Sequence, residues 1–158
     1  MPTIIDGNNL IGCSPDIALD DPEARKKIIH LIKKYQKNKK NNLIIVFDGK
    51  PDTLFVESHS LDKFSVVYPR FGYSADDEIK KILGGYSDCK AVTLVSSDRE
   101  LKNFARKMGI KTLNSIEFYY ELKKVYRMSG KKEEKLKRIH GKISKQEVDK
   151  WMKIFKND

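Results

Sequence analysis

The chain has 158 residues, of which 39% are hydrophobic and 34% are charged, and its formal net charge is +10. This composition suits one folded domain and excludes a disordered chain. No apolar run approaches the roughly 18 residues that a membrane span needs. The first residues lack the pattern of a signal peptide, and two isolated cysteines do not make a disulfide framework. We therefore expect a cytoplasmic protein.

The positive charge is concentrated in the C-terminal quarter. Residues 123–158 contain 13 Lys or Arg and 5 Asp or Glu, a net charge of +8, whereas residues 1–122 have a net charge of +2. Basic segments attract polyanions, because lysines that neutralise phosphates release bound counterions. RNA is the expected partner. A solvated lysine-rich surface, a ribosomal surface or a second copy of the chain would also account for the charge.

Short apolar runs alternate with amphipathic segments along the chain. Five runs have the length and composition of strands: residues 2–5, 43–47, 64–68, 91–95 and 110–113. Apolar residues at helical spacing predict helices at residues 22–35, from residue 75, at 99–108 and from 116 to about 127. The alternation predicts an α/β domain, and the unbroken apolar runs favour a mainly parallel sheet that is covered on both faces.

The predicted domain occupies residues 1–128. Residues 129–142 are charged and poor in apolar residues, which indicates a linker or a loosely packed helix. A capping-box pattern begins at Ser144, and Trp151 and Phe155 follow on one face of the predicted helix. We expect residues 129–158 to form a basic linker and a C-terminal helix that docks on the same domain.

Three of the predicted strands are followed by an aspartate: Asp6, Asp48 and Asp98. Parallel strands present their carboxyl ends at one edge of the sheet, which is where open α/β folds bind ligands. Asp76 and Asp77 open a helix after another strand, at the same edge. The sequence therefore predicts a cluster of four or five carboxylates there.

Such a cluster is electrostatically unfavourable, because like charges raise each other's pKa. A Mg²⁺ or Mn²⁺ ion, which prefers oxygen ligands, resolves the conflict and could clamp a phosphodiester and activate water. Each acid alone also has a structural interpretation as a turn residue or a helix cap. Their shared position at one edge favours the metal site.

Four motifs stand in order along the chain: Ile5-Asp6-Gly7-Asn8-Asn9-Leu10-Ile11, Val46-Phe47-Asp48-Gly49, Ser74-Ala75-Asp76-Asp77-Glu78-Ile79 and Val95-Ser96-Ser97-Asp98-Arg99-Glu100-Leu101. In this order and at this spacing they resemble the YacP-like branch of the NYN/PIN-domain nucleases. The resemblance covers approximately residues 1–128. It implies a PIN-like three-layer α/β/α sandwich and a metal-dependent endoribonuclease.

The resemblance also implies six catalytic residues: Asp6, Asp76, Asp98, Asp48, Asp77 and Asn9. The first three would be the ligands of Mg²⁺ or Mn²⁺. The other two acids would support them, and the asparagine would orient a ligand or a water. Asn8 stands where we expect a larger residue, so either asparagine could point into the site.

An aromatic and basic segment directly precedes Asp76, comprising Tyr68, Arg70, Phe71 and Tyr73. Such side chains beside an active edge could stack on unpaired bases. They could also pack the loop onto the sheet, and we favour this second interpretation.

The leading hypothesis is a metal-dependent endoribonuclease that hydrolyses RNA, with ribosome-associated RNA as one candidate substrate. The alternative is a non-catalytic RNA- or ribosome-binding module with a PIN-like fold, which the C-terminal charge supports independently of the acids. A third hypothesis is a phosphoryl-transfer or receiver-type domain. Against it, the chain lacks a G-x-x-x-x-G-K-[ST] loop, and Asp6 is followed by Gly7 and Asn8 rather than by an Asp-x-Asp pair.

Overall fold

A parallel sheet of five strands forms the centre of the fold in the computed structural model, which describes residues 2–39, 41–49 and 63–140. The strand order is β3-β2-β1-β4-β5, and every neighbouring pair is parallel. The strands are β1 (Pro2–Asp6), β2 (Asn42–Val46), β3 (Phe64–Val67), β4 (Thr93–Val95) and β5 (Lys111–Leu113). The predicted fold class is confirmed.

The strands form where the sequence is apolar on both faces. Ile4 and Ile5 of β1 are fully buried and lie opposite Ile44 and Ile45 of β2. Consecutive residues of a strand point to opposite faces of the sheet. Burial of both neighbours therefore requires a layer of helices on each side.

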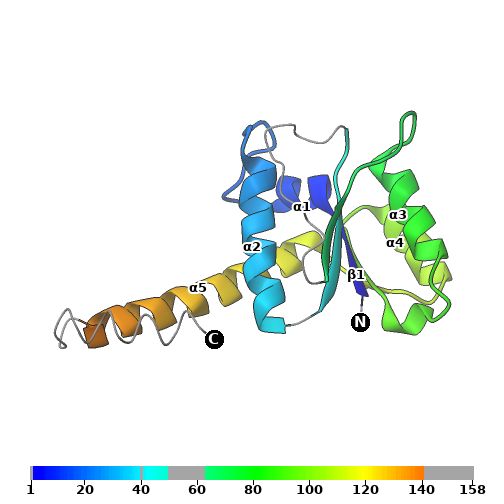
Figure 1. The fold of residues 1–158 in the computed structure, drawn as a ribbon. Coiled ribbons are helices and arrows are strands. Elements are labelled where there is room, and N and C mark those ends of the chain that lie inside the picture. Colours follow the sequence, from blue (N-terminus) through cyan, green and yellow to red (C-terminus); the bar gives the residue numbers. More distant parts are fainter. Residues whose placement is uncertain (1, 40, 50–62, 141–158) are drawn as a thin grey trace.

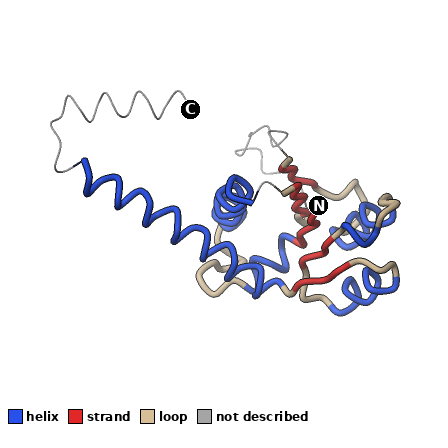
Figure 2. Tube along the Cα trace, turned by 90° about the horizontal axis from the view of Figure 1, so that it is seen from below, coloured by secondary structure: helices blue, strands red, loops and turns tan. Residues whose placement is uncertain are grey.

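Helices supply these two layers (Figures 1 and 2). One face carries α1 (Gly7–Cys13), α2 (Ala24–Lys39) and the first part of α5 (Ser115–His140), and the other carries α3 (Ala75–Gly84) and α4 (Arg99–Lys107). A short 3₁₀ helix, η1 (Cys89–Ala91), precedes β4. The molecule is thus the three-layer α/β/α sandwich that the family resemblance implies.

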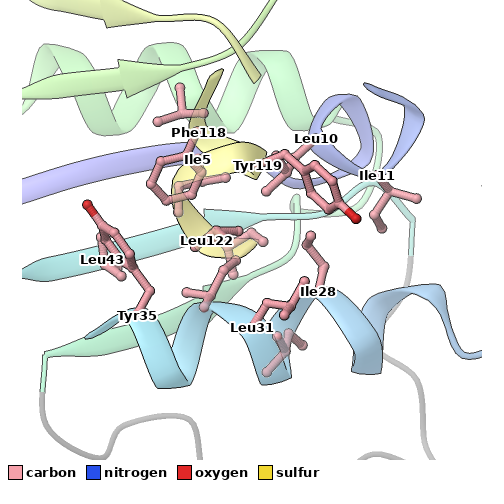
Figure 3. Close-up of a cluster of buried hydrophobic side chains, with 14 of the residues drawn as sticks. Ile5, Leu10, Ile11, Ile28, Leu31, Tyr35, Leu43, Phe118, Tyr119 and Leu122 are labelled. Atoms are coloured by element: carbon pink, nitrogen blue, oxygen red, sulfur yellow. The ribbon is translucent and has the colours of Figure 1, made fainter. Parts of the chain in front are cut away.

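Each layer has its own hydrophobic core. The core under α1, α2 and α5 is shown in Figure 3 and includes Ile5, Leu10, Ile28, Leu43 and Leu122. The core under α3 and α4 includes Ile4, Ile79, Leu83, Leu94 and Leu101. The strands β1, β2 and β4 contribute to both cores, and β1 is the middle strand of the sheet.

Two elements go beyond the sequence prediction. The first is α1, a helix that the sequence analysis does not predict and that begins directly after β1. The second is α5, which continues past Arg127 to His140, so that the described part of the segment predicted as a linker or a loosely packed helix is helical. The predicted helix after Ser144 lies outside the described residues. None of the helices that the structure describes is long and apolar enough to cross a membrane.

The direction in which the sheet grows reverses beside β1. The strands β2 and β3 extend it on one side, and β4 and β5 extend it on the other. At such a switch point the connections leave neighbouring strands in opposite directions and open a crevice at their carboxyl ends. Asp6 ends β1, and residues 96–98 follow β4. The topology therefore places both segments at this crevice.

Gly7 allows α1 to start against the end of β2. A Cβ atom at this position would lie 2.6 Å from Cδ1 of Phe47 and 2.8 Å from the carbonyl oxygen of Val46. Both distances are well below a normal contact, so a larger residue would displace α1. This helix carries Asn8 and Asn9, and the close approach at Gly7 therefore sets their position.

Replacement of Gly7 by alanine is expected to destabilise the protein by about 1–3 kcal/mol, the usual cost of overpacking. The matched control is Gly130→Ala, because a Cβ at this position within α5 has no atom within 4 Å. The control variant is expected to be neutral or stabilised by up to about 1 kcal/mol. Urea unfolding of both variants gives the comparison, and equal free energies of unfolding would contradict the crowding at Gly7.

Candidate active site

A buried aspartate lies at the centre of the candidate site. Asp6 ends β1, its side chain is held within the sheet edge, and only 5% of the residue is exposed. Burial raises the pKa of its carboxyl from the ordinary 3.8 to about 6, and the charges of Asp76 and Asp98 add to the rise. The three predicted metal ligands, from three different elements, therefore lie near enough to interact electrostatically.

Ser96 connects two of these acids. Its side chain is fully buried, and its hydroxyl donates a hydrogen bond to Oδ2 of Asp6 over 3.0 Å. The same hydroxyl oxygen accepts the backbone N–H of Asp98 over 3.1 Å. The sequence analysis did not single out Ser96. Its only signal was its place inside the motif that follows β4.

Asp98 is both a helix cap and a candidate catalytic residue. It is the N-cap of α4, where its Oδ1 accepts the backbone N–H groups of Glu100 and Leu101 over 2.8 and 3.2 Å. The cap fixes the carboxylate at the carboxyl end of β4. From that position its charge raises the pKa values of both Asp6 and Asp76.

Asp76 is the second residue of α3 and is half-buried. Burial raises the pKa of its carboxyl, and the charges of Asp98, Glu100 and Asp48 raise it further. The negative charges at this edge therefore come from several segments of the chain. Perturbed pKa values of this kind cluster at functional sites.

Asp48 is exposed and links the end of β2 to the start of α3. Its Oδ1 accepts the backbone N–H of Ala75 over 3.0 Å, and its backbone carbonyl accepts a hydrogen bond from Arg25 over 2.6 Å. The Arg25 guanidinium also lies over the rings of Phe47 and Tyr68, 5.3 and 5.5 Å from their centres. These contacts position the Asp48 carboxylate at the rim of the site.

Asp77 takes part in the capping of α3 and not in the cluster of acids. It is exposed and forms a capping box with Ser74, whose backbone N–H donates to Oδ2 of Asp77 over 3.0 Å. The Ser74 hydroxyl in turn accepts the backbone N–H of Asp77 over 3.2 Å. These hydrogen bonds lower the pKa of Asp77. The structure thus gives Asp77 a stabilising role at the start of α3 and does not group it with the other acids.

The two asparagines of α1 hold opposite sides of the crevice. Oδ1 of Asn8 accepts the backbone N–H of Asp48 over 3.0 Å, on the β2 side. Oδ1 of Asn9 accepts the backbone N–H of Ser97 over 2.8 Å and the hydroxyl of Ser115 over 2.7 Å, on the side of β4 and α5. Asn9 therefore positions the segment that contains Asp98. Its amide oxygen already has two donors.

The oxygen atoms at this edge have the chemistry that Mg²⁺ and Mn²⁺ prefer, because they come from carboxylates, a hydroxyl and amides. Among the side chains that the structure describes, however, no group of three or more His, Cys, Asp or Glu is arranged to hold a metal ion. The donor set fits a hard divalent cation, and the carboxylates would have to move closer together to bind one.

The segment before α3 differs from the prediction. We expected its aromatic side chains to pack the loop onto the sheet, but 99% of Phe71 and 52% of Tyr73 are exposed. The prediction is therefore wrong for Phe71. The loop is instead ordered by polar contacts between Arg70 and Glu78.

A basic groove of about 630 Å³ lies along α5 and is separate from the acids. Its cationic lining consists of Lys123, Lys124, Arg127 and Lys131. Asp16 is paired with one of them, since its Oδ2 lies 3.0 Å from Nζ of Lys123. Because the other three cations on α5 are exposed, the groove is positively charged. None of the six predicted catalytic residues lines it.

The fold and the arrangement of acids define a nuclease-like α/β domain of the PIN-related type. The chain belongs to the family of YacP-like NYN domains, whose model matches residues 3–156. The resemblance seen in the four motifs is thereby confirmed. No curated protein matches the chain significantly.

Among the solved structures that resemble the chain are two crystal structures of Rae1 (YacP) from Bacillus subtilis. One has a TM-score of 0.75 and 21% sequence identity, and the match covers 99% of this chain and 92% of the other. The second is a mutant, with a TM-score of 0.68, 23% identity and coverage of 93% and 89%. At this level of identity the likeness establishes a common fold.

Substitution of Asp6 by asparagine is expected to stabilise the metal-free protein as the pH rises. The folded state raises the pKa of Asp6 from 3.8 to about 6. At low pH the carboxyl is protonated in both the folded and the unfolded state, and stability is unaffected. Above pH 6 it is ionised in both states, and its ionisation then lowers the free energy of unfolding by up to about 3 kcal/mol. The amide that replaces the carboxyl carries no charge at any pH. The stability difference between the two proteins should therefore grow by about 2 kcal/mol between roughly pH 4 and pH 7.

Urea unfolding in EDTA at several pH values measures this difference, because the other titrating groups are shared by both proteins. A stability difference that does not change with pH would show that burial does not disfavour the Asp6 carboxylate.

Proposed function

We propose that this protein is a metal-dependent endoribonuclease that hydrolyses phosphodiester bonds of RNA. The observation that carries the proposal is the buried Asp6 carboxyl, whose pKa is raised by burial and then by Asp76 and Asp98. A fold gains no stability from gathering three acids at a switch point. A divalent cation would relieve their repulsion.

Asp6, Asp76 and Asp98 would hold Mg²⁺ or Mn²⁺ in this proposal. The bound ion would supply Lewis-acid chemistry to the phosphodiester and to water. Ser96 orients the Asp6 carboxylate, and Asn9 fixes the backbone of Ser97 next to Asp98. Asp48 would support the site from the rim.

The substrate class follows from the charge of the molecule. The formal net charge is +10, and the groove on α5 is lined by four cations and one acid. Phosphate contacts from such surfaces provide most of the non-specific affinity for nucleic acids. We include ribosome-associated RNA among the candidate substrates because of the charge of residues 123–158. Cys13 and Cys89 are both free, which agrees with a reducing cytoplasmic setting.

Asp98→Asn is the sharpest test of catalysis. Asparagine is also a good N-cap, so the variant should keep α4 intact while it removes one charge from the site. Cleavage of labelled single-stranded RNA in Mn²⁺ or Mg²⁺ is expected to slow by about 100-fold or more, and EDTA should abolish it in the unmodified protein.

Asp88→Asn serves as the matched control. Asp88 is exposed, precedes η1 and makes no capping hydrogen bond with its side chain, so the same loss of charge should leave cleavage unchanged. Cleavage by Asp98→Asn at the rate of this control would rule out the proposed role of Asp98.

A second candidate function is RNA binding without catalysis. The observation that favours it is the basic groove on α5, since the groove exists independently of the acids. In that case RNA would bind equally well in EDTA, and no tested RNA would be cleaved in the presence of either metal.

Both candidate functions predict that the groove binds RNA. Neutralisation of Lys124, Arg127 and Lys131 together by glutamine should weaken the binding of single-stranded RNA. The slope of log K against log salt concentration should fall by about 2, because each phosphate contact on a single strand contributes about 0.7. Fluorescence anisotropy at a series of salt concentrations measures both quantities.

The control neutralises three exposed lysines at the opposite edge of the sheet from the acids, Lys90, Lys107 and Lys111. The formal charge of the two triple variants is identical. If both lower the salt dependence equally, total charge and not the groove determines RNA binding.

A further inference from the structure

Phe71 is the most exposed large apolar side chain among the residues that the structure describes, with 99% of its surface accessible. An isolated Phe ring in water contributes nothing to the core and adds apolar surface that favours association. Single exposed apolar side chains are common on protein surfaces, so the loop that carries Phe71 and the neighbours of Phe71 decide what the ring can do.

The loop that carries Phe71 is held in place by a buried carboxylate. Glu78 is 6% exposed, and its Oε1 accepts hydrogen bonds from Nε of Arg70 over 3.0 Å and from the backbone N–H of Arg70 over 3.4 Å. The backbone N–H of Tyr73 donates to the carbonyl of Arg70 over 2.9 Å, and Gly72 has a φ of 84°. A tight turn thus presents Phe71 at its tip.

A cation and a second aromatic ring stand beside Phe71 in the same turn. The Arg70 guanidinium lies 4.5 Å from the centre of the Tyr73 ring, and Tyr73 is 52% exposed. Because Glu78 holds the guanidinium against the Tyr73 ring, these two planar groups are positioned before any ligand arrives, and the Phe71 ring next to them is open to solvent. Planar groups of this kind are the usual contacts of unpaired nucleobases.

The loop lies beside the candidate active site. It connects β3 to α3, and Asp76 is the second residue of α3. Figure 1 shows the loop rising beyond the carboxyl edge of the sheet, directly before α3. A base held here would belong to a strand that also passes the acids.

We propose that Phe71, with Arg70 and Tyr73, forms a platform on which unpaired bases of RNA stack. The inference rests on the proposed function for its ligand, RNA, but not for catalysis. Stacking tolerates any base, because every base has a π face, and it requires that the base be unpaired. The platform therefore selects single-stranded segments and guides them toward Asp76.

The test compares three substitutions of Phe71 by the affinity of each protein for a short labelled single-stranded RNA. All are measured in EDTA and in the Asp98→Asn background, so that cleavage does not interfere. Phe71→Trp is expected to keep the affinity, whereas Phe71→Leu and Phe71→Ala are expected to lower it by about tenfold, the effect of losing one base–aromatic stack. Thermal unfolding confirms that each variant is folded.

Two further measurements separate stacking from other causes. Affinity for a duplex of the same sequence should not depend on residue 71, and Leu19→Ala, which truncates another exposed apolar side chain, should leave single-strand affinity unchanged. The emission of 2-aminopurine within the RNA, at saturating protein, should be quenched by the Phe and Trp proteins and not by the Leu protein.

The inference is overturned if the protein with Phe71 binds no single-stranded RNA, or if the Trp, Leu and Ala variants all bind it with the same affinity as that protein. It is also overturned if leucine preserves the affinity, because the position would then require only apolar bulk, as a protein-docking residue would. Loss of binding in the Leu and Ala variants, together with no metal-dependent cleavage by the unmodified protein, would support the platform and refute the nuclease. Unchanged RNA affinity in the Leu and Ala variants, together with metal-dependent cleavage by the unmodified protein, would refute the platform and support the nuclease.

Discussion

The ionisation of one buried carboxyl group is the constraint around which the candidate site is arranged. Asp6 has to be at the end of the central strand to reach the crevice, and that position removes it from water. Its ionised form is then disfavoured by burial and by two other acids. The Ser96 hydroxyl offsets part of this cost through its hydrogen bond. A protein without use for the charge would be more stable with an apolar residue at this position.

The short helix α1 organises the residues around that carboxyl. Asn8 holds the end of β2, and Asn9 holds the segment after β4 and the start of α5. The helix has no side-chain cap and lies close to Phe47 only because Gly7 has no Cβ. Its position therefore results from tertiary packing. One short helix therefore contacts both sides of the crevice.

This dependence on packing explains which features could be predicted from the sequence. The strand-end acids were predictable, since apolar runs mark strands and parallel strands share an edge. The helix α1 was not, because it has only seven residues and begins with glycine, and because the side chain of its N-cap residue, Asp6, makes no capping hydrogen bond. Ser96 also carries no signal of its own, and only the pairing of β1 with β4 brings it beside Asp6. Local sequence patterns do not determine the order of the strands in the sheet.

Two side chains have environments that the pattern of strand-end acids does not predict. Asp77 follows Asp76 at a helix start, and its spacing of three residues from the N-cap Ser74 is that of a capping box, so its carboxylate accepts the Ser74 backbone N–H. Phe71 is apolar, and apolar residues are usually buried. Its exposure is decided by the turn that Glu78 holds through Arg70, a contact between a loop residue and a helix residue.

Because α5 is one continuous helix, it fixes the distance between the candidate site and the far end of the groove. The helix starts at Ser115, whose hydroxyl and backbone N–H are both bonded to the segment around the acids, and it runs without a break to His140. At a rise of about 1.5 Å per residue, Lys131 stands about 24 Å along the helix axis from Ser115. A loop would leave that separation variable. A polyanion that touches both the crevice and the far end of the groove must therefore be long enough to span a fixed length.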